Sequence, residues 1–198
     1  TATDQRGVNT LYAHNGFGDL VRIESPDRGT WTFEVDAAGR ETSQTDPRGV
    51  VKTTAYDALS RPVSMTYSSA GVAANTPGFV TGNVTHTFVY DTCPQGQGLL
   101  CGFTDPTGTT VYAYNAWGDL VSKTWTGAIG APGAGISLVT AYAYDPQGRL
   151  TSMTLPSGKV MAVTYGADGR TQALTYDGLG VVSNVQWTAF DAVAGWTW

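Results

Sequence analysis

Asp and Asn residues recur along the chain three positions before a glycine or serine, and their oxygens could carry chemistry. They are Asn15, Asp36, Asp57, Asn115 and Asp145. Such oxygens could act as acid and base in pairs or as Ca²⁺ ligands. A calcium loop, however, carries ligands at alternate positions, and DPQGRL has only one oxygen ligand of this kind. Because these residues recur wherever a turn recurs, we interpret them as turn formers.

The two histidines, His14 and His86, also lack a catalytic setting. His86 lies in the alternating segment VTHTFVYD, and His14 takes the place that Tyr114 and Tyr144 hold in other copies of the motif. No GxSxG segment, which would mark a nucleophilic serine, is present. The sequence therefore predicts no enzymatic activity, no cofactor and no metal.

Cys93 and Cys101 form the one pair of thiols. They bracket PQGQGLL between two predicted strands, so a hairpin would bring them close enough to bridge. A closed zinc site would need four ligands. We expect a disulfide if the protein is secreted, because the compartment decides whether thiols oxidise.

Aromatic residues are more numerous than the turns require, with ten Tyr and six Trp. Tyrosines two positions apart, such as Tyr112 and Tyr114, lie on one face of a strand and can pair across strands. Trp117, at the tip of YNAWGDL, and Trp125, near the segment GAIGAPGAG, have no evident packing role. Both are candidates for stacking on sugars, which makes a carbohydrate-binding surface the alternative function.

The turn motif repeats along the chain. Aligned on its fourth position, it reads HNGFGDL at Gly18, VDAAGRE at Gly39, YDALSRP at Ser60, YNAWGDL at Gly118, YDPQGRL at Gly148, YGADGRT at Gly169 and YDGLG at Gly180. Gly18 and Gly39 are 21 residues apart, as are Gly148 and Gly169. Glycine at this position accepts positive φ, so the alignment predicts positive φ at Ser60 too.

A second kind of corner, such as DPRG at Asp46 and DPTG at Asp105, alternates with the first. The segments between them, such as VVKTTAYD, alternate apolar and polar residues, which is the period of a half-buried strand. The sequence therefore predicts an all-β fold, an antiparallel strand meander. The Gly-rich segments 68–85 and 127–135 interrupt the period and are predicted to be surface loops.

Composition excludes two classes of partner. The chain has a formal net charge of −5 and only 14% charged residues, so it has no basic patch for nucleic acid. Its apolar runs are shorter than the roughly 20 residues of a membrane-spanning helix. We expect neither nucleic-acid binding nor a membrane span.

The motifs YDALSRP, YNAWGDL and YDPQGRL, with the interleaved DPRG and DPTG, resemble the tyrosine-aspartate (YD) repeats of bacterial RHS proteins. Related repeats form the shell of Tc toxin complexes and occur in teneurins. The tail VSNVQWTAFDAVAGWTW also resembles an RHS segment. The resemblance covers nearly the whole chain, so residues 1–198 are expected to be a single array of about seven to eight repeats.

The resemblance implies a meander that spirals into a hollow shell, which encloses a C-terminal toxin or other cargo in polymorphic toxin systems. It implies neighbouring repeats and the cargo as partners, and a secreted or cell-surface location. The chain lacks the self-cleaving segment, toxin domain and delivery domain of a complete member. We therefore expect a non-enzymatic piece of the shell wall.

Overall fold

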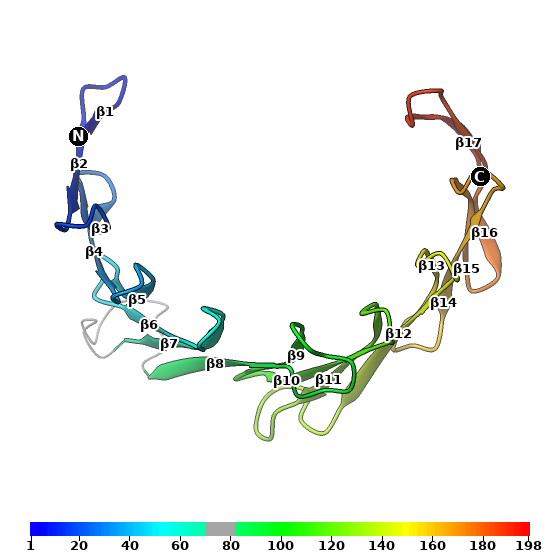
Figure 1. Cartoon of the computed structure of the whole chain (residues 1–198), viewed down its shortest axis with the longest axis horizontal. Helices are drawn as coiled ribbons and strands as arrows, with labels where there is room; N and C mark the ends of the chain where they lie inside the picture. Colours follow the sequence, from blue (N-terminus) through cyan, green and yellow to red (C-terminus); the bar gives the residue numbers. More distant parts are fainter. Residues whose placement is uncertain (70–81) are drawn as a thin grey trace. The chain divides into compact units, whose positions relative to one another are not determined.

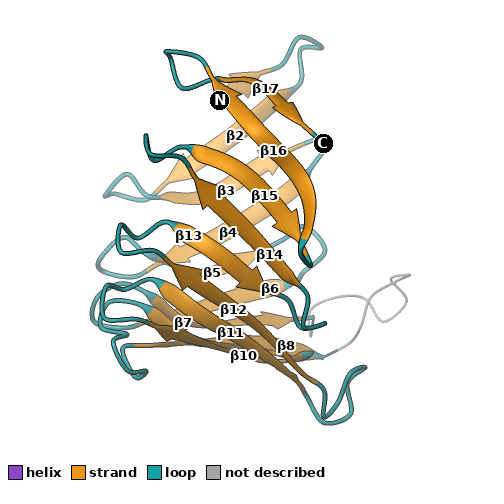
Figure 2. Ribbon diagram, turned by 90° about the vertical axis from the view of Figure 1, so that its right-hand side faces the viewer, coloured by secondary structure: helices purple, strands orange, loops and turns teal. Residues whose placement is uncertain are grey.

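The computed structural model describes residues 1–69 and 82–198, and these ranges contain seventeen strands and no helix (Figure 2). Neighbouring strands of the described ranges pair in antiparallel register. The predicted all-β antiparallel meander is confirmed. No helix long and apolar enough to cross a membrane occurs in the described ranges.

The chain divides into two compact units. The first comprises Thr1–Phe88 and Thr104–Pro106, and the second comprises Val89–Phe103 and Thr107–Trp198. The strands at the change from one unit to the other are β8 (Asn83–Tyr90) and β9 (Leu100–Asp105).

In the first unit each strand pairs with the next one along the chain, from β1 to β8 (Figure 1). Its strands before β8 are β1 (Ala2–Thr3), β2 (Asn9–His14), β3 (Leu20–Ser25), β4 (Gly29–Val35), β5 (Glu41–Thr45), β6 (Val51–Tyr56) and β7 (Pro62–Ser68). The strands thus follow one another in space in the order of the sequence.

The second unit repeats this arrangement from β10 to β17. Its strands after β9 are β10 (Gly108–Tyr114), β11 (Leu120–Gly127), β12 (Ser137–Tyr144), β13 (Leu150–Thr154), β14 (Val160–Tyr165), β15 (Thr171–Tyr176), β16 (Leu179–Trp187) and β17 (Val193–Thr197). In both units, the same repeated sequence pattern produces the same meander.

We call the turns that begin with Asn15, Asp36, Asp57, Asn115 and Asp145, and their equivalents, corners of the first kind. The strand register shifts by one residue just before most of them. In β10 and β11, Ala113 pairs with Ser122, whereas Tyr114 pairs with Leu120, so Val121 is the extra residue of a β-bulge. Equivalent shifts precede the corners that follow β2, β4, β6, β12 and β14. A bulge redirects side chains at a strand end, and here it positions the residue that precedes the corner, which is aromatic in most copies.

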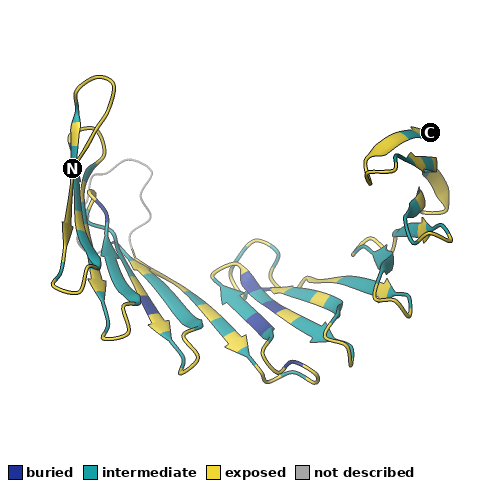
Figure 3. Ribbon diagram, turned by 45° about the horizontal axis from the view of Figure 1, so that its top comes forward, coloured by how far each residue is buried: buried dark blue, intermediate teal, exposed yellow. Residues whose placement is uncertain are grey.

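Neither unit has a conventional hydrophobic core. Among the described residues, Cys101 is the only buried hydrophobic residue, with 4% of its surface exposed. Most strand residues are half-buried (Figure 3), including Val160–Val163 on β14. Stability must therefore come from the backbone ladders, from side-chain packing along each sheet, and from the polar corners.

Both predicted loops need correction at their borders. Ser68 belongs to β7 and pairs with Asn83 of β8, so strand pairing extends into both ends of the predicted loop 68–85. Residues 70–81 of that prediction lie outside the described residues. In the predicted loop 127–135, Gly127 is the last residue of β11, and the Ala131 and Ala134 amides form successive turns with the carbonyls of Ala128 and Ala131.

The last copy of the motif was misaligned at Gly180. Gly180 lies within β16 and pairs with Thr175, whereas the turn itself is formed by Asp177 and Gly178, with φ of 54° and 79°. Two consecutive residues with positive φ are characteristic of a tight two-residue hairpin, for which Asp-Gly is a preferred sequence. Gly180 stands three residues after Asp177, as the fourth position does in the other copies, but this turn is shorter than the others.

Candidate functional site

The corners of the first kind share one hydrogen-bonding pattern over five residues. At Asp57, Oδ1 accepts bonds from the amides of Leu59 at 2.8 Å and Arg61 at 2.9 Å. The Ser60 amide donates to the Asp57 carbonyl at 3.1 Å, and Ser60 has a φ of 63°, as the alignment requires. Corners at Asn15, Asp36, Asn115 and Asp145 make the same pair of side-chain bonds. These residues are positioned to hold turns.

The glycines at the fourth position have the backbone that the sequence predicted. Positive φ is found at Gly18, Gly39, Gly118, Gly148 and Gly169. Ser60 is the only non-glycine residue among these aligned positions, and its hydroxyl accepts a hydrogen bond from Arg40 at 3.2 Å. That contact gives the serine a role that glycine could not fill.

Two variants of the corner differ at the first and fifth positions. In the Asp–Arg variant, the arginine Nε donates to the aspartate Oδ2 at 2.7 Å, as in the pairs Asp36–Arg40, Asp57–Arg61 and Asp145–Arg149. In the Asn–Asp variant, Asn15 and Asn115 donate from Nδ2 to Asp19 and Asp119 at 2.9 Å. Both variants therefore join the first and fifth side chains by a hydrogen bond. The fifth residue donates in the Asp–Arg variant, and the first residue donates in the Asn–Asp variant.

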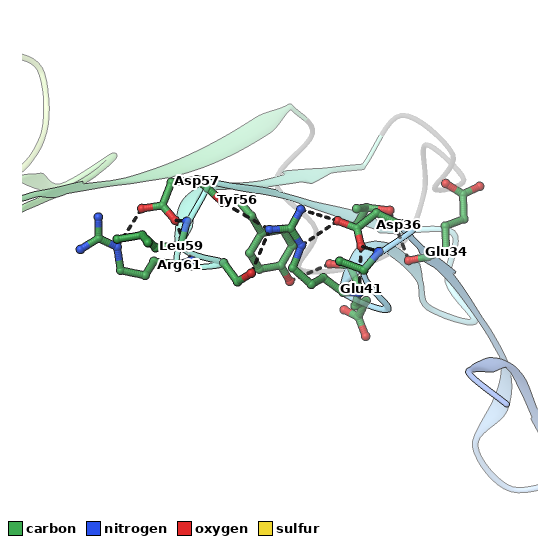
Figure 4. A network of polar contacts seen from close by, with 11 residues as sticks. Glu34, Asp36, Glu41, Tyr56, Asp57, Leu59 and Arg61 are labelled. Carbon is green, nitrogen blue, oxygen red and sulfur yellow. Dashed lines mark hydrogen bonds and ion pairs between the residues drawn. The ribbon is translucent and has the colours of Figure 1, made fainter. Parts of the chain in front are cut away.

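Contacts also run from one corner to the next (Figure 4). Arg40 Cζ lies 4.9 Å from the centroid of the Tyr56 ring, and its Nη1 donates to the Asp57 carbonyl at 3.3 Å. Arg149 lies 4.5 Å from the ring centroid of Tyr165 in the same way. Each such arginine thus pairs with its own corner and stacks on the aromatic residue before the following one.

The aromatic residue before a corner also reaches back to the preceding strand. The Tyr56 hydroxyl donates to the Glu41 carbonyl at 2.8 Å, and Glu41 directly follows the preceding corner. We call such a bond an aromatic tie. Further ties join Tyr144 to Leu120, Tyr165 to Leu150, Trp187 to Thr171 and Tyr114 to Leu100. The ties link successive repeats edge to edge.

Replacing Tyr144 by phenylalanine is expected to reduce the free energy of unfolding by about 1 kcal/mol, because the Leu120 carbonyl loses its half-buried donor. Urea unfolding followed by tryptophan fluorescence measures this change. Tyr142→Phe is the matched control, since the Tyr142 hydroxyl has no partner among the described residues, and we expect a change within about 0.5 kcal/mol. Equal losses in the two variants would contradict a role for the tie.

The carboxylates of the Asp–Arg corners have lowered pKa values for identifiable reasons. The side chain of Arg40 lowers the pKa of Asp36, and the backbone amide of Arg61 lowers that of Asp57. Burial acts to raise the pKa of Asp145, but the hydrogen bonds from Arg149 outweigh it and hold the pKa below its ordinary value. The corners therefore favour ionised carboxylates.

The lowered pKa values make stability depend on acid pH. The stabilisation is complete above the ordinary value of 3.8 and is lost as the pH falls through the lower pKa values of the folded protein. We expect the urea midpoint to stay level down to about pH 5 and to fall between about pH 4 and pH 2. A variant with Asp36, Asp57 and Asp145 changed to Asn should fall less steeply over this range. A urea midpoint that stays the same between pH 5 and about pH 2 would refute the prediction.

The candidate sugar-stacking residues have different surroundings. Trp117 is 89% exposed and lines a pocket of about 550 Å³. Trp125 is half-buried on β11, and alanine at Gly133 would place its Cβ 3.1 Å from the Trp125 ring. The Trp125 ring therefore lies beside Gly133 of the loop after β11, whereas Trp117 is exposed.

The residues considered for catalysis are scattered. His14 is exposed at the end of β2, and His86 packs edge-on against Tyr67 with ring centroids 5.8 Å apart. Cys93 and Cys101 form a disulfide, with Cα atoms 5.5 Å apart. The described parts of the chain contain no cluster of three or more His, Cys, Asp or Glu residues that could hold a metal ion.

The family comparison supports this repeat geometry. The family model described as "RHS Repeat" matches residues 35–72 and 135–160, which include corners of the Asp–Arg variant. Within these two segments the chain carries RHS repeats. No curated protein matches the sequence. The predicted resemblance to RHS/YD repeats is confirmed, and the repeats account for the corner pattern.

Solved structures with the same RHS-repeat fold belong to Tc toxins. The crystal structure of TcdB2-TccC3 without its hypervariable C-terminal region is 18% identical, has a TM-score of 0.73, and is matched over 93% of this chain. The TcdB2-TccC3-Cdc42 structure is also 18% identical, with a TM-score of 0.73 over 96% of this chain. The Photorhabdus luminescens Tc holotoxin pore is 17% identical, with a TM-score of 0.71 over 96% of this chain. The chain spans about 10% of the length of each matched chain.

Sequence reasoning missed the roles of the fifth corner position and of the preceding aromatic residue. It assigned tyrosines to a ladder, but Tyr56, Tyr144 and Tyr165 also donate to backbone carbonyls. A signal was present in the repeats themselves. Where the first position is Asn, the fifth is Asp, as in Asn15–Asp19 and Asn115–Asp119. Where the first position is Asp, as in the other variant, the fifth is Arg. This exchange indicates direct contact between the two positions.

Proposed function

We propose that this chain is a non-enzymatic structural module, a segment of an RHS-repeat wall that encloses or presents cargo in its parent protein. The observation that carries the proposal is the set of five aromatic ties, each of which joins the end of one strand to the strand before it. Repeats that stabilise one another in this way suit an extended surface. Cys101 is the only buried hydrophobic residue among those described. So little buried apolar surface does not suit an enclosed active site.

Similarity to the Tc toxins supports the cargo role. The matched complexes contain TccC3, and one was solved without its hypervariable C-terminal region. By analogy, we infer that RHS repeats adjoining this segment complete the wall and that a C-terminal toxin or other cargo is its partner. A secreted or cell-surface location fits the Cys93–Cys101 disulfide, because disulfides persist in oxidising compartments.

Protease protection tests the enclosing role in the complete polypeptide that contains this segment. The cargo is expected to resist digestion while the wall is folded, and to be digested once urea has unfolded the wall. The same cargo produced alone is the control. Equal digestion rates for free and attached cargo would overturn the enclosing function.

The absence of enzymatic function has a separate test. Incubation of the chain with ester, peptide and glycan substrates is expected to give no turnover above that of heat-denatured protein. Turnover that purifies with the chain would contradict the proposal. The half-buried carboxylates of the Asp–Arg corners bind arginines and turn amides, which leaves them poorly placed as acid or base.

A carbohydrate-binding surface is the second candidate, and one observation favours it: the exposed indole of Trp117. The Tc toxin comparisons give no support for a sugar ligand. A glycan array tests it directly, with Trp117→Ala as the variant that should lose any signal. An array without signal at high protein concentration would remove this candidate.

A further inference from the structure

The pocket beside Trp117 occupies a place that an arginine fills elsewhere in the same chain. In the Asp–Arg corners, Arg40 and Arg149 stack on Tyr56 and Tyr165 of the following repeats. At the corner Asn115–Asp119, the fifth residue is aspartate. The following repeat still supplies a tyrosine, Tyr144, whose hydroxyl is tied to Leu120.

The pocket combines aromatic surface with uncompensated negative charge. Trp117, Tyr142 and Tyr144 line it together with Asp119 and Asp145. Asp145 is paired with Arg149, whereas Asp119 has no ion pair among the described residues and accepts only from the neutral Asn115 amide. Asp119 and Tyr144 line the same pocket, and the pKa of Tyr144 is raised by burial and by the charge of Asp119.

We propose that this pocket binds the guanidinium group of an arginine side chain presented by another polypeptide. The ligand would stack on Tyr144 and donate to Asp119, as Arg40 stacks on Tyr56 and donates to Asp36. It could also donate to the Asp145 carbonyl, which corresponds to the Asp57 carbonyl that accepts from Arg40. The inference is independent of whether the chain encloses cargo.

Guanidinium fits this site better than other ligands with aromatic affinity. It is planar, stacks on rings and presents N–H groups in a fixed fork, whereas a lysine ammonium is a compact and strongly hydrated charge. A sugar would leave the charge of Asp119 without a counterion. Trp117, at the open side of the pocket, offers a second aromatic surface for the arginine methylenes.

The first unit contains a natural control. The corner Asn15–Asp19 also belongs to the Asn–Asp variant, has an exposed aromatic tip in Phe17, and borders a pocket of about 420 Å³. The residue before the next corner is Val35, so this pocket lacks the ring on which a guanidinium would stack. It should bind arginine much more weakly.

Titration of the full chain with N-acetylarginine amide, followed by the Trp indole signals in ¹H–¹⁵N spectra, tests the proposal. We expect shifts centred on the Trp117 indole, assigned with Trp117→Phe, and a Kd of about 1–10 mM. The citrulline analogue has nearly the same shape without the charge and should bind at least about tenfold more weakly. Equal binding of both probes, or binding of glycans without binding of arginine, would overturn the proposal.

Two variants make the test specific to this pocket. Asp119→Asn should weaken arginine binding about tenfold, whereas Asp19→Asn should leave it unchanged. In Asn115→Asp/Asp119→Arg, the corner is converted to the Asp–Arg variant, and its own arginine should fill the pocket and abolish binding while the chain stays folded. Undiminished binding in the folded double variant, or in Asp119→Asn, would refute the site.

Discussion

Alanine at Gly127 is expected to lower the free energy of unfolding of the second unit by about 3 kcal/mol, because the added methyl overpacks the end of β11. Its Cβ would collide with the backbone carbonyl of Gly133, which an adjacent side-chain rotation cannot relieve. The loop after β11 must then move, although it closes through a bond from the Gly127 amide to the Ile136 carbonyl at 3.0 Å. That displacement should also expose Trp125.

Urea unfolding gives the free energy, and the wavelength of Trp emission reports the exposure of Trp125. Gly180→Ala is the control, since its Cβ would meet nothing within 4 Å and its φ is not positive. We expect that variant to remain within about 0.5 kcal/mol of the parent. A Gly127→Ala protein as stable as the control would show that the loop yields freely.

Removing the disulfide by Cys93→Ser/Cys101→Ser is expected to cost about 2.5 kcal/mol, the loop-closure entropy of a short loop. The two cysteines are eight residues apart in sequence. The same loop is also held by a hydrogen bond, which the Gly98 amide donates to the Asp91 side chain at 2.7 Å. Loss of the cross-link frees the unfolded chain and also replaces the buried Cys101 sulfur by a hydroxyl.

Comparing the parent with and without a reductant separates these two effects. Reduction removes only the bond, whereas the double serine variant also changes polarity at position 101. We expect reduction to account for most of the loss in the urea midpoint. If reduction leaves the midpoint unchanged while the serine variant is destabilised, the cross-link contributes nothing and packing of Cys101 explains the loss.

Local chemistry made most of the fold predictable. An Asx residue that accepts two amides, followed by a residue with positive φ, specifies a turn by itself, so Asp57 and Ser60 could be assigned without any distant partner. The alternating segments between such turns then had to be strands. The prediction at Gly180 is wrong because Asp177-Gly178 forms a different and shorter turn, although Gly180 matches the motif in standing three residues after Asp177.

The contacts between repeats could not be predicted in the same way. Arg40 and Tyr56 meet because strand pairing and the bulge before the corner bring residues from successive repeats together. The sequence shows the composition of each corner but not the direction in which its arginine points. The pocket at Trp117 depends on the same relation, since it arises where Asp119 replaces an arginine and Tyr144 remains.

The chain of aromatic ties has a consequence for how such proteins change during evolution. Each of the five ties joins a residue before one corner to the strand that follows the preceding corner, as Tyr165 joins Leu150. Duplication or loss of a complete repeat by recombination would therefore lengthen or shorten the sheet while the chemistry of every remaining junction is preserved. A single substitution at a fifth position, by contrast, would change local ligand chemistry without altering length.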